Sequence, residues 1–196
     1  MRKSKSEKRC DDYDQFSEEY DAWDAEHRSV ERQRRSLVRS LKGKILEVGV
    51  GTGANLEYYP EGADVTGIDV STGMLEKAVM RARARDCCNI KLLNADAENI
   101  PFLDDTFDAV VGTFVFCSFE DPLRAAREVK RVVKSGGVFV TLGYHTKMVA
   151  KILQESGWII RSQLEWDSVD RPIGKIVARK TVDSIWGVGS IGDHSK

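Results

Sequence analysis

Glu47 stands just before a set of alternating glycines, and this spacing is the part of the sequence best suited to chemistry. The segment 44–55 reads K-I-L-E-V-G-V-G-T-G-A-N, with glycines at 49, 51 and 53. Glycines allow a main chain with positive φ and leave room for a ligand beside it. A carboxylate at the end of an apolar strand attracts a cation and repels a pyrophosphate. The stretch therefore predicts a ligand-binding turn that favours a positively charged group.

Two more carboxylates follow apolar runs where strands are expected to end. Asp69 closes the run 63–69, about 20 residues after the glycine turn, where an acid can accept both hydroxyls of a ribose. Asp96 follows the run 90–94. Because open α/β sheets bind ligands outside the carboxyl ends of their strands, Glu47, Asp69 and Asp96 are expected around one cavity. Together they suit a cationic nucleoside.

The glycines leave other functions open. Gly49, Gly51 and Ala54 also satisfy the looser dinucleotide pattern G-x-G-x-x-A, and nicotinamide-dependent oxidoreductases likewise carry an acid after the second strand. Glu47 speaks against that hypothesis, because it would repel a pyrophosphate. A non-catalytic cofactor-binding or scaffold protein is a third possibility, since the sequence offers no obvious general base.

Composition narrows the class of protein. The chain has 196 residues, enough for one α/β domain, and its 30 Lys and Arg residues balance 31 Asp and Glu residues. No overall field therefore recruits nucleic acid or acidic membrane. The four cysteines form no C-x-x-C pair, which favours reduced thiols in a cytoplasmic protein. No apolar stretch has the length of a transmembrane helix, and no secretory signal is expected.

Periodicity and helix signals predict the arrangement of the domain. Strands are expected at about 44–49, 63–69, 90–94, 109–113 and 138–142, and helices at 53–59, 71–86, 122–134 and 146–156. Two further β segments, 158–166 and 174–180, should form a terminal hairpin. The order predicts three layers, with a mostly parallel sheet of six or seven strands and a C-terminal antiparallel hairpin.

The two ends of the chain are predicted to lie outside this sheet. Aromatic and apolar residues recur at helical spacing from position 13 to position 41, which predicts a helical cap over residues 1–41. Tyr13, Tyr20 and Trp23 could line a ligand site beneath it. Residues 42–181 form the predicted ligand-binding domain, and residues 182–196 are expected to be a flexible tail.

These motifs together resemble the Rossmann-like (class I) S-adenosylmethionine-dependent methyltransferases. Residues 47–53 match their first motif, E/D-x-G-x-G-x-G, and residues 69–75 resemble their D-x-S-x-x-M-L pattern. Residues 101–110 are similar to P-F-x-D-x-x-F-D-x-V, and residues 128–137 to E-x-x-R-V-L-K-P-G-G, with Ser135 in place of the proline. The likeness covers about residues 44–145. It is greatest to enzymes that methylate quinone precursors, phospholipid amines and thiols.

The resemblance implies S-adenosylmethionine as cofactor, S-adenosylhomocysteine as product, and no metal. It implies that Asp96 accepts from the adenine amino group and that the Ala97 N–H faces the ring. The cofactor-binding residues that it implies are Glu47, Gly49, Gly51, Gly53, Asn55, Asp69, Val70, Met74, Asp96, Ala97 and Thr113.

The methyl acceptor is less well specified. His145, just past the expected strand 138–142, and Tyr20 in the N-terminal stripe are tentative catalytic residues. Cys117 lacks the preceding proline of cytosine-5 enzymes, and residues 114–116 lack the tetrad of N6-adenine enzymes, so nucleic acid is not expected as acceptor. An apolar loop at 114–116 favours a small, partly hydrophobic acceptor, methylated by in-line displacement. In the family, the segment between the expected strand 138–142 and the expected helix 146–156 often carries an insertion that covers the substrate, and here it is nearly absent. The resemblance therefore implies that the N-terminal helices, or a second subunit of a homodimer, complete the substrate pocket.

Overall fold

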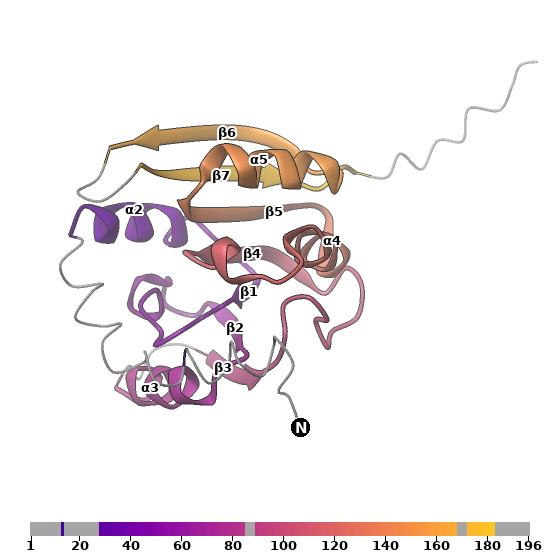
Figure 1. The fold of residues 1–196 in the computed structure, drawn as a ribbon. Coiled ribbons are helices and arrows are strands. Elements are labelled where there is room, and N and C mark those ends of the chain that lie inside the picture. The colour runs from indigo at the N-terminus through magenta and orange to yellow at the C-terminus, as the bar shows by residue number, and fades with distance from the viewer. Residues whose placement is uncertain (1–12, 14–27, 85–88, 168–171, 183–196) are drawn as a thin grey trace, which may run out of the picture.

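A seven-stranded sheet forms the centre of the molecule, with strand order β3-β2-β1-β4-β5-β7-β6 (Figure 1). The computed structural model describes residue 13 and residues 28–84, 89–167 and 172–182. The strands are β1 (Lys44–Val48), β2 (Asp64–Asp69), β3 (Asn89–Asn94), β4 (Phe107–Thr113), β5 (Val133–Tyr144), β6 (Ile159–Trp166) and β7 (Ile173–Arg179). The first five strands pair in parallel, whereas β7 pairs antiparallel with both β5 and β6. The predicted mostly parallel sheet with a terminal hairpin is confirmed.

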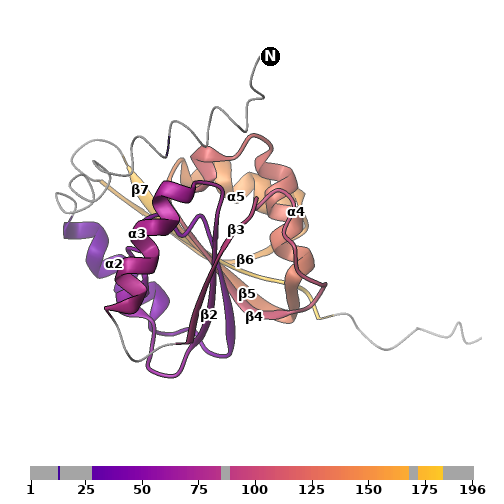
Figure 2. The ribbon, with the colours of Figure 1, turned by 90° about the horizontal axis from the view of Figure 1, so that it is seen from below.

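Helices cover both faces of this sheet. Figure 2 shows α2 (Arg28–Val38) and α3 (Thr72–Arg83) on one side, and α4 (Pro122–Val132) and α5 (Thr146–Glu155) on the other. Successive residues of β1 contribute to the apolar cores on opposite faces of the sheet, because side chains alternate across a strand. Leu46 and Val48 pack with residues of α4 and α5, whereas Ile45 packs with residues of α2 and α3. The three-layer prediction is therefore confirmed.

Local sequence signals determine where two helices begin. The Ser71 hydroxyl accepts from the Met74 N–H at 3.1 Å and caps α3. Asp121 caps α4 in the same way through the Arg124 N–H at 3.0 Å, and Pro122 occupies the first turn. Both starts agree with the sequence prediction.

The expected helix 53–59 is reduced to a 3-10 turn, Leu56–Tyr58. The N–H groups of Gly53, Leu56 and Tyr58 each donate to the carbonyl three residues earlier, those of Val50, Gly53 and Asn55. Gly53 has a φ of +85°, which a right-handed helix does not accommodate, and Pro60 follows closely. The glycines that open the ligand turn therefore leave too few residues for a full helix.

Residues at the chain ends are described only in part. The predicted N-terminal stripe is seen at Tyr13 and in α2, while Phe16, Tyr20, Trp23 and His27 lie outside the described residues, as does the predicted tail from residue 183. Among the helices described, none combines the length and the apolar character needed to cross a membrane.

Candidate functional site

A cavity of about 620 Å³ opens where the parallel strands β1, β2, β3 and β4 end. It collects residues from the segments that follow these four strands, which the sheet order brings to one edge. Of the predicted cofactor-binding residues, those lining it are Gly49, Gly51, Asp69, Val70, Met74, Asp96, Ala97 and Thr113. This volume includes space that is open to solvent, and the enclosed part is smaller.

The glycine turn lines the cavity through Gly49 and Gly51. Gly49 has a φ of +65°, and a Cβ there would lie 2.3 Å from Val115 Cγ2. Gly51 also has positive φ but faces open space. Gly53 does not line the cavity, because it packs behind the turn, where a Cβ would lie 2.7 Å from Leu56 Cδ1. Each glycine is needed for a different physical reason.

Asp69 fixes the turn to the end of β2. Its Oδ2 accepts from the Gly51 N–H at 2.9 Å, and its Oδ1 accepts from the Ser71 N–H at 3.0 Å. A carboxylate oxygen can accept more than one hydrogen bond, so these contacts orient the group and leave capacity for ligand hydroxyls. The position is the one that the sequence predicts for a ribose partner.

Asp96 and Ala97 line the opposite part of the cavity. Asp96 Oδ1 accepts from the Glu98 N–H at 2.9 Å, which closes a local turn after β3. The Asn94 side chain donates to the carbonyls of Asp69 and Val70 at 3.1 and 2.8 Å. These bonds tie the ends of β2 and β3 together and set the two acids on one cavity.

Glu47 lies beneath the cavity and does not line it. The side chain is 1% exposed; Oε1 accepts from Asn55 Nδ2 and Oε2 from the Tyr59 hydroxyl, both at 2.8 Å. Burial raises the pKa of the Glu47 carboxyl to about 7, against the lowering effect of Tyr59, Asn55 and the Arg34 charge. Burial, together with this carboxyl, also raises the pKa of Tyr59.

Asn55 connects this buried acid to the cavity wall. Its Nδ2 also donates to Thr113 Oγ1 at 3.0 Å, and Thr113 lines the cavity. Within the described residues, Asn55 Oδ1 is buried and has no hydrogen-bond partner. A buried acceptor without a partner is costly, so this oxygen suits an N–H donor supplied by a ligand.

Of the two tentative catalytic residues, only His145 is described, and it does not line this cavity. His145 occupies the N-cap position of α5 with a φ of +57° and without a side-chain capping bond, and it lines a separate open groove together with Lys147, Met148 and Glu165. Tyr20 lies outside the described residues.

Several cavity residues were not specified by sequence reasoning. Tyr13 is not one of these, because it was among the aromatic residues expected to line the site; it does line the cavity, and its hydroxyl is hydrogen-bonded to Ser118 Oγ at 2.5 Å. Phe114, Val115, Ser118 and Phe119 line the wall after β4. The aromatic run at 114–116 signalled an apolar loop, but no pattern marked Ser118, or Tyr59 as the partner of Glu47.

Known proteins share the domain that holds this site. Residues 46–141 match the family model described as a methyltransferase domain. Over 111 residues the chain is 37% identical to a phosphatidylethanolamine N-methyltransferase of Cereibacter sphaeroides, covering 56% of this chain and 55% of that one. Over 109 residues it is 38% identical to thiol S-methyltransferase TMT1B of Rattus norvegicus, covering 52% and 44%. The chain thus spans about half the length of these curated relatives.

A solved structure supports the same architecture. A Thermotoga maritima structure described as a S-adenosylmethionine-dependent methyltransferase, possible histamine N-methyltransferase, superposes with a TM-score of 0.70 at 20% identity. The match covers 88% of this chain and 100% of that one, and at this identity it establishes the fold alone. The family match identifies residues 46–141 as a methyltransferase domain, and the strand order and the cavity at the strand ends agree with that assignment.

Proposed function

We propose that this protein uses S-adenosylmethionine to methylate a small, partly apolar acceptor. The observation that carries the proposal is the cavity that joins the glycine turn, Asp69 and Asp96 at one edge of the sheet. Two carboxylates at that edge attract a positively charged nucleoside.

The residues present fit the cofactor. Asp69 would hold the ribose hydroxyls, and Asp96 with the Ala97 N–H would hold the adenine. At the β1 end, the unpartnered Asn55 Oδ1 beside Thr113 fits the ammonium of the methionine part. Glu47 would supply its negative charge from behind Asn55, to which it is hydrogen-bonded.

When bound, the cofactor supplies a methyl group already activated on a cationic sulfur. The residues of this chain therefore need to orient the acceptor and exclude water. Phe114, Val115 and Phe119 form an apolar wall that suits both tasks. Among the described residues that line the cavity there is no histidine or lysine. An acceptor that is nucleophilic without a strong protein base, such as a thiol or an amine, fits this wall best.

Calorimetry with S-adenosylhomocysteine tests the proposal. We expect saturable binding with a dissociation constant of about 1–100 μM, the range in which many enzymes bind their substrates. Transfer of a labelled methyl group to a panel of thiols and amines then separates an enzyme from a non-catalytic scaffold. Binding of NADH at micromolar concentration, without binding of S-adenosylhomocysteine, would instead favour the nicotinamide-dependent oxidoreductase.

We further propose that residues 1–41 cap the cavity of domain 42–181, with 182–196 as a tail. The contact between the Tyr13 and Ser118 hydroxyls supports this, because it connects the N-terminal region to the cavity wall. Cytoplasmic location and a homodimer are also part of the proposal; the cysteine usage supports the first and the missing insertion the second.

Replacing Tyr13 with phenylalanine should speed the release of S-adenosylhomocysteine. The lost hydrogen bond corresponds to about 0.5–1.5 kcal/mol, or about 2- to 10-fold in dissociation rate. Stopped-flow displacement measures this rate. Ser118→Ala should have the same effect, and the double variant should add nothing further, because both remove one contact. Additive effects of the two substitutions would show that the contact does not close the cavity.

A further inference from the structure

The segment 95–106 joins β3 to β4 and forms one side of the cavity, yet it contains only turns and bends. Its first residues, 95–97, line the cavity. Its internal bonds are short in range: the Asn99 N–H donates to the Asp96 carbonyl at 3.0 Å, and the Thr106 hydroxyl donates to the Leu103 carbonyl at 2.6 Å. A segment without helix or strand needs partners elsewhere to keep one conformation.

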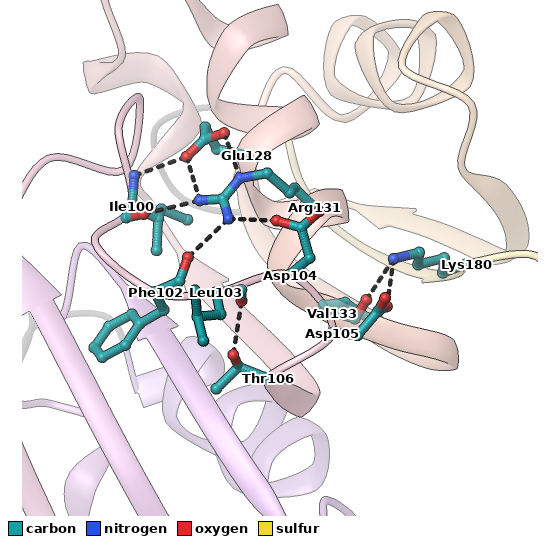
Figure 3. A network of polar contacts seen from close by, with 10 residues as sticks. All are labelled: Ile100, Phe102, Leu103, Asp104, Asp105, Thr106, Glu128, Arg131, Val133 and Lys180. Atoms are coloured by element: carbon teal, nitrogen blue, oxygen red, sulfur yellow. Dashed lines mark hydrogen bonds and ion pairs between the residues drawn. The ribbon is translucent and has the colours of Figure 1, made fainter.

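Arg131 of α4 supplies most of these partners (Figure 3). Its Nε and one terminal nitrogen donate to the two oxygens of Glu128, both at 2.8 Å. Its terminal nitrogens also donate to the carbonyls of Ile100 and Phe102, at 2.8 and 2.7 Å, and to Asp104 Oδ1 at 2.8 Å. Every N–H of the guanidinium is thereby used, which fixes its plane.

Glu128 completes this arrangement from the same helix. Its Oε2 also accepts from the Ile100 N–H at 2.9 Å, so the pair holds both the N–H and the carbonyl of Ile100. The Arg131 hydrogen bonds are the main cause that keeps the pKa of Glu128 below its usual value. The apolar face of α4 is buried in the core, which gives the pair a rigid base. We call Arg131 and Glu128, with their contacts to residues 100–104, the Arg131 clamp.

The other polar contacts of the segment are at its ends, while its middle also packs on the core through Ile100 and through the edge contact of Phe102 with Phe107. Near the cavity, Glu98 Oε1 accepts from the Glu120 N–H at 2.7 Å. At the far end, Thr106 donates through its N–H to the Val132 carbonyl at 2.8 Å, and Lys180 Nζ donates to Asp105 Oδ1 at 2.7 Å. Figure 3 shows the Lys180 contact beside the clamp and separate from it. The middle of the segment therefore depends on the clamp for its polar contacts to the rest of the fold.

We propose that Arg131 is a positioning residue for cofactor binding. It acts through the main chain of residues 100–104 and presets Asp96 and Ala97 before the ligand arrives. The inference rests on the proposed function, which places the adenine against these two residues. Without the clamp, residues 95–104 sample other conformations, and binding has to supply the ordering free energy that the guanidinium now provides.

The test compares Arg131→Met and Arg131→Lys with Lys180→Met, which removes a different side-chain contact of the same segment, the one to Asp105. Calorimetry with S-adenosylhomocysteine should show an affinity at least about tenfold below that of wild type for both Arg131 variants. The lysine does not restore affinity, because an ammonium cannot form the planar fork. The Lys180→Met variant should bind S-adenosylhomocysteine within about twofold of wild type, even if its melting temperature falls as much as those of the Arg131 variants. Hydrogen exchange in the ligand-free protein should rise across residues 95–104 in the Arg131 variants alone.

The outcomes separate this inference from the proposed function. Wild-type protein that does not bind S-adenosylhomocysteine refutes the proposed function itself. Wild-type protein that binds, with Arg131 variants within about twofold of it, refutes the positioning role alone. Equal affinity losses in the Arg131 and Lys180 variants would also overturn it, because they would reflect stability and not position. If Arg131→Met does not fold, Arg131→Lys carries the comparison, since it keeps the charge and the length of the side chain.

Discussion

Replacing Asp69 with alanine is expected to weaken the binding of S-adenosylhomocysteine by about 5- to 150-fold, or about 1–3 kcal/mol. In the proposed complex, the carboxylate accepts from hydroxyls of the ribose, and hydrogen bonds to a charged acceptor are stronger than neutral ones. The substitution also removes the acceptor of the Gly51 and Ser71 N–H groups, which loosens the glycine turn at the same time. Calorimetry measures the affinity directly.

Two variants separate the role of the charge from that of the turn. Asp69→Asn keeps the size of the side chain and one acceptor oxygen, so its affinity should fall between those of wild type and alanine. Asp64→Ala, at the opposite end of β2, is the matched control, because its side chain only accepts from Asn89 Nδ2 at 3.2 Å, far from the cavity. Unchanged affinity in Asp69→Ala would contradict the ribose assignment.

The sequence was sufficient for most of the fold because its signals are local. Ser71 and the Asp121–Pro122 pair act within one helical turn, so their effect is independent of the rest of the molecule. The segment 53–59 was mispredicted because the positive φ of Gly53 is a property of the ligand turn, and the helical pattern does not reveal it. Residues 135–137, which the prediction left between the helix 122–134 and the strand 138–142, instead lie inside β5, which begins at Val133 through an irregular pairing with β4.

The candidate site was predictable where topology alone decides position. Asp69 and Asp96 follow parallel strands that end at the same edge, so they had to lie close together. Unlike these two acids, Glu47 does not line the cavity. Because side chains alternate along β1, it lies on the same face as Ile45, where it meets Asn55 and Tyr59. What covers that face depends on long-range packing, which sequence spacing does not reveal.

Replacing Glu47 with glutamine should remove a pH-dependent loss of stability. In the folded protein burial raises the pKa of this carboxyl to about 7, from 4.5 for an unperturbed glutamic acid. Between these pH values the folded state holds a proton that the unfolded state has released. The contribution to stability is therefore complete below pH 4.5, falls as pH rises toward 7, and stays low above. The shift corresponds to about 3 kcal/mol.

Urea unfolding at several values between about pH 5 and pH 8 measures this slope. Wild type should lose stability relative to Glu47→Gln across the range, since glutamine is neutral throughout. Glu61→Gln, which removes an exposed carboxylate shortly after Tyr59, is the control and should follow the wild-type profile. Parallel curves for wild type and Glu47→Gln would show that the buried carboxyl does not hold its proton.

The same protonation should couple to cofactor binding. The charged groups around Glu47 are Arg34, which favours its ionised form, and Asp69, which disfavours it. A cationic ligand above Asn55 adds to the effect of Arg34, so binding should release a proton from Glu47 near neutral pH. Affinity for S-adenosylmethionine should then rise with pH, by up to about tenfold per unit below pH 7, and level off above. Calorimetry in two buffers of different ionisation enthalpy counts the released protons. Glu47→Gln should bind more weakly, release none and lose the pH dependence, whereas proton release equal to that of wild type would assign the titration to another group.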